Sequence, residues 1–442
     1  MNVLILQPPI MQLNTAYPSG AYLSRFFKRE GCNVKWLDLN IELFYSIFCY
    51  KGLKKIFELG RKKALEMADK AEQNGQGSVC FNLRRYISQE NLWCNWIDRI
   101  TAILRGHGFE SAHSFVFGAH VPRGNRMENY LNSLDHDLTT DDARTLSSLA
   151  LADLADFITT VLDKNFSLVR YAESLTISES TFEQVEKGAD SLILREFFVP
   201  VLEKNVCPIA EQLFEQDKKL LVCISIPFPG IFAASLCAGR FLKEKYKNKL
   251  YISFGGGFVN TELRETKEKS LAIYCDSISY DRGYASYKTL LNQLEECKNN
   301  FCDISKNNNL PLFSAPIYNV RKFLKDKNGN FFIVEEASAT KEDLEYEKNM
   351  TSSIVPDFTD IDFSRYPRLI DDTNPMHRLW SDGAWIKAYM AHGCYWHKCA
   401  FCDVTLDYVK SFCMTDIHAL YNGLLDQCRK KNIFGIHFSE IK

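Results

Sequence analysis

The sequence lacks a marked excess of charge, an uninterrupted membrane-length apolar segment and a secretory leader. Its 442 residues carry a formal net charge of −2, which gives no reason to expect nucleic acid or an anionic membrane as a partner. The run Leu220–Gly239 is uncharged throughout and approaches membrane-spanning length. Prolines and a glycine interrupt it at the middle, so a strand, a loop and a helix are predicted there. The first nine residues contain no basic residue and end in Pro8-Pro9, unlike a secretory signal.

The chain also lacks the pattern of a disulfide framework. It has fifteen cysteines, and twelve of them are scattered singly, mostly among apolar or helical residues. This distribution fits the reducing cytoplasm, where we expect the protein to reside. The other three, Cys394, Cys399 and Cys402, fall within nine residues.

The N-terminal residues predict an α/β fold. A composition of 46% hydrophobic and 24% charged residues is ordinary for a globular protein, and the length allows two or three domains. Residues 2–6 form an apolar, strand-like run, 21–30 have helical spacing that Gly31 ends, and 34–39 form a second strand-like run. A strand, loop, helix and strand in this order open a doubly wound parallel sheet.

The sheet pattern is interrupted after about residue 50 and resumes at Lys219. Residues 51–216 show no strand-like alternation and predict a helical insertion, with the best helices at 54–73, 81–104, 141–162 and 182–202. Beyond it, strands are predicted at 220–226, 250–254 and 271–280, and helices at 231–246 and 284–297.

Three consecutive glycines, Gly255, Gly256 and Gly257, follow the predicted strand 250–254. At the carboxyl end of a strand, glycines let backbone amides approach a ligand closely, so these three are candidate cofactor-binding residues. A tight turn that needs no ligand explains the run equally well. The G-x-G-x-x-G spacing of a dinucleotide site is absent.

The last third of the chain predicts a hairpin, a linker and a separate unit. Asn328-Gly329 is a strong hairpin signal between strand-like runs. The charged, proline-containing stretch 337–375 predicts an extended linker. A strand at 384–390, the cysteine cluster, a helix at 415–430 and a strand at 433–438 follow.

The three clustered thiols predict a metal site. Three thiolates on one loop leave a tetrahedral ion, or one corner of an iron–sulfur cube, with an open position. A closed zinc site is the main alternative, and His392, His397 or Cys413 would then be the fourth ligand. Two further interpretations remain: His392 and His397 lie outside the first coordination shell of the metal, or the thiols bind no metal.

The cluster in its context resembles the first unit of the radical S-adenosylmethionine (SAM) enzymes, whose signature is usually C-x3-C-x2-C. Here the spacing is C-x4-C-x2-C, and Tyr395-Trp396 and Ala400-Phe401-Cys402 are also similar to that family. The chain resembles in particular the branch with an N-terminal cobalamin-binding-like domain. That similarity lies in residues 2–9, 17–23, 31, 38–40, 224–228 and 254–257.

The resemblance implies cofactors and site residues. Cys394, Cys399 and Cys402 would hold a 4Fe–4S cluster whose fourth iron binds SAM, with Phe401 near the adenine and Glu440 near a polar contact to SAM. Such an enzyme also needs an electron donor. Cobalamin is a further candidate cofactor, although the chain has no Asp-x-His-x-x-Gly motif for its cobalt.

The implied domains are a cobalamin-binding-like domain at 1–50 and 217–300, the helical insertion at 51–216, a hairpin and linker at 301–380, and an incomplete radical SAM barrel at 381–442. The barrel has one strand–helix unit plus a strand. Three hypotheses follow. The first is a radical SAM enzyme acting on an unknown substrate, or the N-terminal portion of one, either as a fragment or as half of a split enzyme that another polypeptide completes. The second is an inactive remnant that binds only a cluster or cobalamin, and the third is a zinc-stabilised scaffold.

Overall fold

The computed structural model describes residues 1–168, 181–297, 301, 311–326, 328–370, 383–404 and 406–441, with only the backbone for 312, 407 and 439–441. Parts of the predicted hairpin and linker segment, 302–310 and 371–380, lie outside this range, as does the side chain of Glu440. None of the described helices is both long and apolar enough to cross a membrane.

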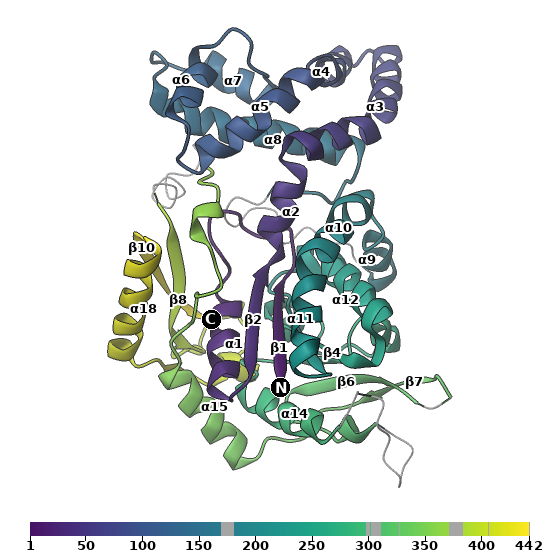
Figure 1. Ribbon diagram of the computed structural model, residues 1–442, viewed down its shortest axis with the longest axis vertical. Coiled ribbons are helices and arrows are strands. Elements are labelled where there is room, and N and C mark those ends of the chain that lie inside the picture. The colour runs from purple at the N-terminus through teal and green to yellow at the C-terminus, as the bar shows by residue number, and fades with distance from the viewer. Residues whose placement is uncertain are drawn as a thin grey trace.

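The centre of the protein is a seven-stranded sheet with the order β2-β1-β3-β4-β5-β6-β7 (Figure 1). Its strands are β1 (Asn2–Gln7), β2 (Asn33–Asp38), β3 (Leu220–Ser225), β4 (Leu250–Gly255), β5 (Ser277–Ser279), β6 (Val320–Lys325) and β7 (Phe331–Val334). The first five are parallel, and β6 and β7 are antiparallel additions. The predicted α/β class with a mostly parallel sheet is therefore confirmed.

Helices cover both faces of this sheet because its central strands are apolar along their whole length. Every residue of β1 and β3 is buried, as expected for parallel strands with helices on each side. On one face, α1 (Ser19–Arg29) meets α14 (Tyr284–Glu296), with the rings of Phe26 and Tyr284 5.3 Å apart. On the other, α11 (Cys207–Gln216) and α12 (Phe232–Tyr246) lie side by side (Figure 1).

The end of the sheet differs from the prediction at one strand. Residues 271–280 were expected to form a strand, but Lys269–Ile273 is a 3-10 helix and only Ser277–Ser279 pairs in the sheet. The hairpin at Asn328-Gly329 is confirmed, and its first strand pairs with β5. The hairpin therefore extends the main sheet.

The region between β2 and β3 is helical, as predicted, and most of it forms a separate layer beyond the carboxyl end of β2 (Figure 1). Its helices are α2 (Leu39–Ile47), α3 (Tyr50–Gln73), α4 (Gly77–Ser88), α5 (Glu90–Leu104), α6 (Phe109–Phe117), α7 (Asn125–Ser133), α8 (Ala143–Val161), α9 (Phe182–Gly188) and α10 (Val199–Val201). The helix expected over 81–104 is divided at Gln89, and the one expected over 182–202 ends at Gly188. A second helical stretch then contains two π-turns, each shortly before a proline, because proline has no N–H for the regular ladder.

The predicted linker is partly wrong. Residues 337–375 were expected to be extended, but α15 (Lys341–Ser353) forms within them. Thr340 and Asp343 make a reciprocal capping box at its start, with the Thr340 hydroxyl accepting from the Asp343 N–H. The S/T-x-x-D/E signal that announces such a helix is visible in the sequence.

The C-terminal unit is a second sheet with the order β10-β8-β9. It contains β8 (Trp385–His392), α17 (Asp407–Lys410), β9 (Cys413–Met414), α18 (Ile417–Lys431) and β10 (Gly435–Ile441). β8 and β10 are parallel and α18 connects them. The predicted strand, cysteine loop, helix and strand are therefore present in that order.

The second sheet is joined to the first where β8 meets the start of α1. The Thr15 hydroxyl donates to the Trp385 carbonyl, and the Tyr389 N–H donates to the Tyr22 hydroxyl at 2.8 Å. The rings of Tyr22 and Tyr389 stack with centroids 5.2 Å apart. We refer to these contacts of residues 15–22 with 385–389 as the seam.

We expect Tyr22→Phe to loosen the seam without unfolding either sheet. The variant keeps the stacked ring but leaves the buried Tyr389 N–H without its acceptor, which costs about 1–3 kcal/mol. Hydrogen exchange over 385–392 should become faster than in wild type, while exchange over β3 stays unchanged. Tyr50→Phe, at an exposed position, is the matched control, and unchanged exchange in Tyr22→Phe would contradict the role of this bond.

Asp38, at the end of β2, makes stability depend on pH. One carboxylate oxygen accepts from the Asn40 N–H at 3.0 Å and the other from the Tyr366 hydroxyl at 2.6 Å. Burial nevertheless raises the pKa of Asp38 to about 6. A folded-state pKa above the unfolded value favours the folded protein at low pH, and this contribution is lost as pH rises through 6.

We therefore expect Asp38→Asn to remove a pH-dependent loss of up to about 3 kcal/mol between pH 4 and pH 7.5. The amide still accepts from Asn40 and can donate to the Tyr366 oxygen, so the local contacts remain. Urea unfolding at both pH values measures the effect, and the variant should gain stability relative to wild type only at the higher pH. An equal difference at both values would contradict the assignment.

Candidate metal loop and cofactor cavity

The three predicted ligands lie on the loop that leaves the carboxyl end of β8. Gly393 begins this loop with φ +79°, and the Cys394 N–H donates to the Val409 carbonyl at 2.7 Å, which closes the loop against α17. Cys394, Cys399 and Cys402 are free, partly exposed thiols. We call residues 393–404 the cysteine loop.

The cysteine loop supplies suitable donors but not an assembled centre. Among the described residues, no group of three Cys, His, Asp or Glu side chains is close enough to hold a metal ion. The donor chemistry nevertheless fits an iron–sulfur cluster, since all three are thiols on one accessible loop. In addition, the Trp396 N–H donates to the Cys394 sulfur at 3.3 Å. Hydrogen bonds to ligating sulfurs are among the features that tune such clusters.

The three residues considered as a fourth zinc ligand have other surroundings. His392 is buried beside the stacked rings of Tyr22 and Tyr389. The His397 ring lies 3.2 Å from the Val409 carbonyl through Nε2. Cys413 is buried and its thiol donates to the Lys348 carbonyl at 3.6 Å.

The resemblance implies SAM contacts for Phe401 and Glu440. The first lies on the cysteine loop itself, and the second lies on the strand that pairs with β8. Phe401 is on the cysteine loop and is 93% exposed, so its ring is free to contact a ligand. The backbone of Glu440 pairs with Ala391 across β10 and β8, after a register shift. This strand position is therefore beside the start of the cysteine loop.

A cavity of about 1100 Å³ opens at the carboxyl ends of β3, β4 and β5. From the helical region between β2 and β3, only Thr181, Phe182 and Val185, at the start of α9, belong to the described lining. β8 forms another wall through Lys387 and Tyr389, and the cavity continues past His392 to Gly393. The cavity thus reaches from the main sheet to the cysteine loop. In a sheet with the order 2-1-3-4-5, ligands bind at this edge.

The predicted glycines lie in this cavity wall. Gly255 ends β4, Gly257 begins the short helix α13 (Gly257–Thr261), and all three glycines line the cavity. Gly256 has φ 115° and ψ −179°, a region open almost only to glycine. The run therefore forms a turn and also borders ligand space.

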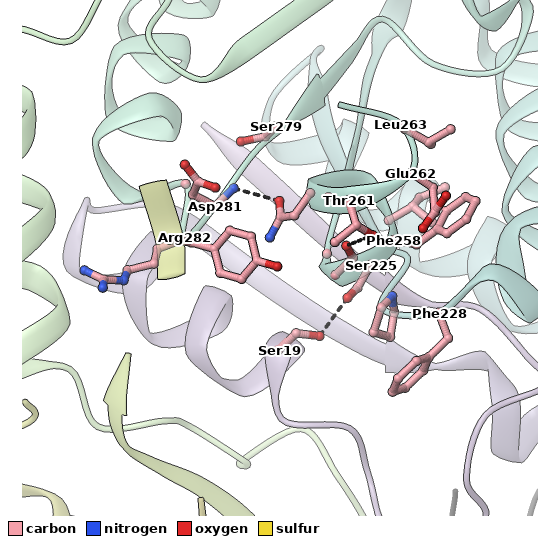
Figure 2. Close-up of a pocket in the computed structure, with 18 of the residues that line it drawn as sticks. Ser19, Ser225, Phe228, Phe258, Thr261, Glu262, Leu263, Ser279, Asp281 and Arg282 are labelled. Atoms are coloured by element: carbon pink, nitrogen blue, oxygen red, sulfur yellow. Dashed lines mark hydrogen bonds between the residues drawn. The ribbon is translucent and has the colours of Figure 1, made fainter. Parts of the chain in front are cut away.

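Polar groups in the cavity fall into two sets (Figure 2). Near the start of α1, the hydroxyls of Ser19 and Ser225 are 2.7 Å apart. On the β5 side, the Asp281 carboxylate accepts from Arg264 at 3.0 Å and from Asn319 at 2.7 Å. Figure 2 shows Arg282 extending away from the Ser19–Ser225 pair.

His392 and Lys387 are cavity residues whose role the sequence did not reveal. Burial, and secondly the Arg282 guanidinium, lower the pKa of His392 to about 3, so its imidazole is neutral near pH 7. Burial also lowers the pKa of Lys387 from its ordinary value. Lys387 in an otherwise apolar strand was the available signal, but only the packing of β8 against α1 shows that it faces ligand space.

The chain matches no protein-family model, no curated protein and no solved structure. Its function is therefore argued from the cysteine loop and the cavity.

Proposed function

We propose that this protein is a radical SAM iron–sulfur protein. The observation that carries the proposal is the placement of three thiols on one loop, directly after the first strand of a parallel β8–α18–β10 unit. Cys394, Cys399 and Cys402 would hold the 4Fe–4S cluster and leave one iron without a protein ligand. When bound and reduced, such a cluster supplies the electron that cleaves SAM and starts radical chemistry.

The residues of this chain would orient and shield the reaction. The cysteine loop borders the cavity at Gly393, so a molecule held in the cavity would lie beside the metal site. The aromatic rings of Tyr17, Tyr22 and Phe228 line this space and limit water around a bound molecule. Phe401 and Glu440 remain the proposed contacts to SAM.

Cobalamin is the proposed second cofactor, and the cavity is its place. The position of the cavity at the carboxyl ends of parallel strands supports this proposal. Gly255, Gly256 and Gly257 would allow the cofactor to approach the backbone. Because the chain has no Asp-x-His-x-x-Gly motif, the protein would bind cobalamin without a cobalt ligand from that motif.

Further barrel strands, from this polypeptide or from a partner, would pair at β10. This strand lies at the edge of its sheet, and an edge strand offers unpaired backbone groups to another strand. Phe434 and Phe438, just before and within β10, are 81% and 36% exposed. A reductase or other electron donor is the second partner that the proposed chemistry requires.

Anaerobic reconstitution tests the proposal. The protein should take up about four irons and four sulfides per chain, and with dithionite and SAM it should form 5′-deoxyadenosine. An intact cluster that yields no 5′-deoxyadenosine would indicate the inactive remnant. Stoichiometric zinc without sulfide would contradict the cluster and indicate the zinc-stabilised scaffold.

A further inference from the structure

The seam brings a lysine and a helix start to the same cavity. Thr15 and Tyr22 contact Trp385 and Tyr389 at the two ends of the seam. In the chain, Ser19 lies between Thr15 and Tyr22, and Lys387 lies between Trp385 and Tyr389. Both Ser19 and Lys387 line the cavity. The seam therefore brings Lys387 of β8 and the first turn of α1 into the lining of one cavity.

Lys387 is a partly buried cation without a counter-ion. It makes no hydrogen bond or ion pair with the described residues, whereas Arg282, the other basic side chain of this kind in the lining, donates to Thr351 at 3.2 Å and to the Ser411 carbonyl. The Asp281 carboxylate is already held by Arg264. Placing an unpaired charge out of water is unfavourable, and a bound anion would offset that cost.

Further donors surround the same space. The amide N–H of Ser19, which lines the cavity, has no acceptor among the described residues, and Pro18 before it supplies no capping side chain. α1 is eleven residues long, so its start carries the positive end of a helix dipole. His392 is only 6% exposed, lines the cavity, and its Nε2 has no partner among the described residues.

We propose that the cavity binds an organic ligand through an oxyanion, a phosphate or a carboxylate, which Lys387 and the start of α1 hold together. One hydroxyl of the hydrogen-bonded Ser19–Ser225 pair donates to the oxyanion, and His392 adds one more polar contact. The aromatic residues of the lining pack against the rest of the ligand. This site depends on the seam and not on a cluster, so it stands independently of the proposed iron–sulfur chemistry.

Ligand-dependent unfolding of the metal-free protein tests the site. Inorganic phosphate and, separately, acetate are titrated at constant ionic strength into wild type, Lys387→Met and Lys35→Met, an exposed strand lysine. At least one of the two ions should raise the unfolding temperature of wild type and of Lys35→Met. Lys387→Met should need at least a tenfold higher concentration of that ion for the same rise. The ion that raises the unfolding temperature more identifies phosphate or carboxylate as the preferred group.

Two results would overturn the proposal. An equal response in Lys387→Met would mean that an adventitious ion binds elsewhere, and no response to either ion in wild type would mean that the oxyanion site is absent. Without added ligand, Lys387→Met should unfold at the same or a higher temperature than wild type, because it removes an unpaired cation. Unfolding at a lower temperature would assign Lys387 to the support of the fold and overturn its ligand role.

Discussion

Alanine substitution of any one of Cys394, Cys399 and Cys402 is expected to abolish the iron–sulfur cluster. The three thiols lie on one loop and supply all the protein ligands of the proposed centre. Two thiolates cannot hold a cube that already has an open iron. After anaerobic reconstitution, iron should fall from about four to below about one per chain, and formation of 5′-deoxyadenosine should fall at least about a thousandfold.

The controls separate this effect from damage to the fold. Cys413→Ala and Cys428→Ala remove buried thiols outside the cysteine loop, so both variants should keep full iron and sulfide. The metal-free loop variants should unfold at the wild-type temperature, because the three thiols are partly exposed. Full iron and sulfide in all three loop variants would refute the proposed ligands.

The success of the sequence-based prediction depended mainly on how far apart in the chain the interacting residues are. β1, β3 and β4 were predicted nearly residue for residue because apolar strands bounded by turn residues are local signals. The helix α15 was missed although its capping box is also local, because its charged composition suggested a linker. The strand expected over 271–280 was too long, because its first residues belong to the 3-10 helix Lys269–Ile273 and only Ser277–Ser279 forms β5.

The cavity could not be predicted because it depends on contacts between distant segments. Ser19 and Ser225 are 206 positions apart in the chain, and the Tyr22–Tyr389 bond spans 367. The sequence contains each residue but not the register that brings β8 against α1. The cysteine loop was predictable as a motif because its donors are local in sequence. That these three thiols gather around a metal remains a prediction.

The glycine run gives the second large effect. Gly256→Ala is expected to destabilise the fold by about 3 kcal/mol or more, because its φ of 115° with ψ −179° is strained for any side chain. A Cβ there would also lie 2.7 Å from the carbonyl carbon and oxygen of Ile226. These are backbone atoms at the end of β3, so the contact cannot be relieved by a change of rotamer. Urea unfolding measures the loss.

Gly255→Ala is the matched control because its Cβ would meet only ordinary contacts, 3.5 Å from the Ser279 oxygen and 3.7 Å from the Tyr287 hydroxyl. It should cost less than about 1 kcal/mol. A large loss at 256 with a small loss at 255 means that the turn alone requires glycine at 256, whatever binds in the cavity. Similar small losses at both positions would show that the turn relaxes, and the requirement for glycine would then rest on the approach of a ligand.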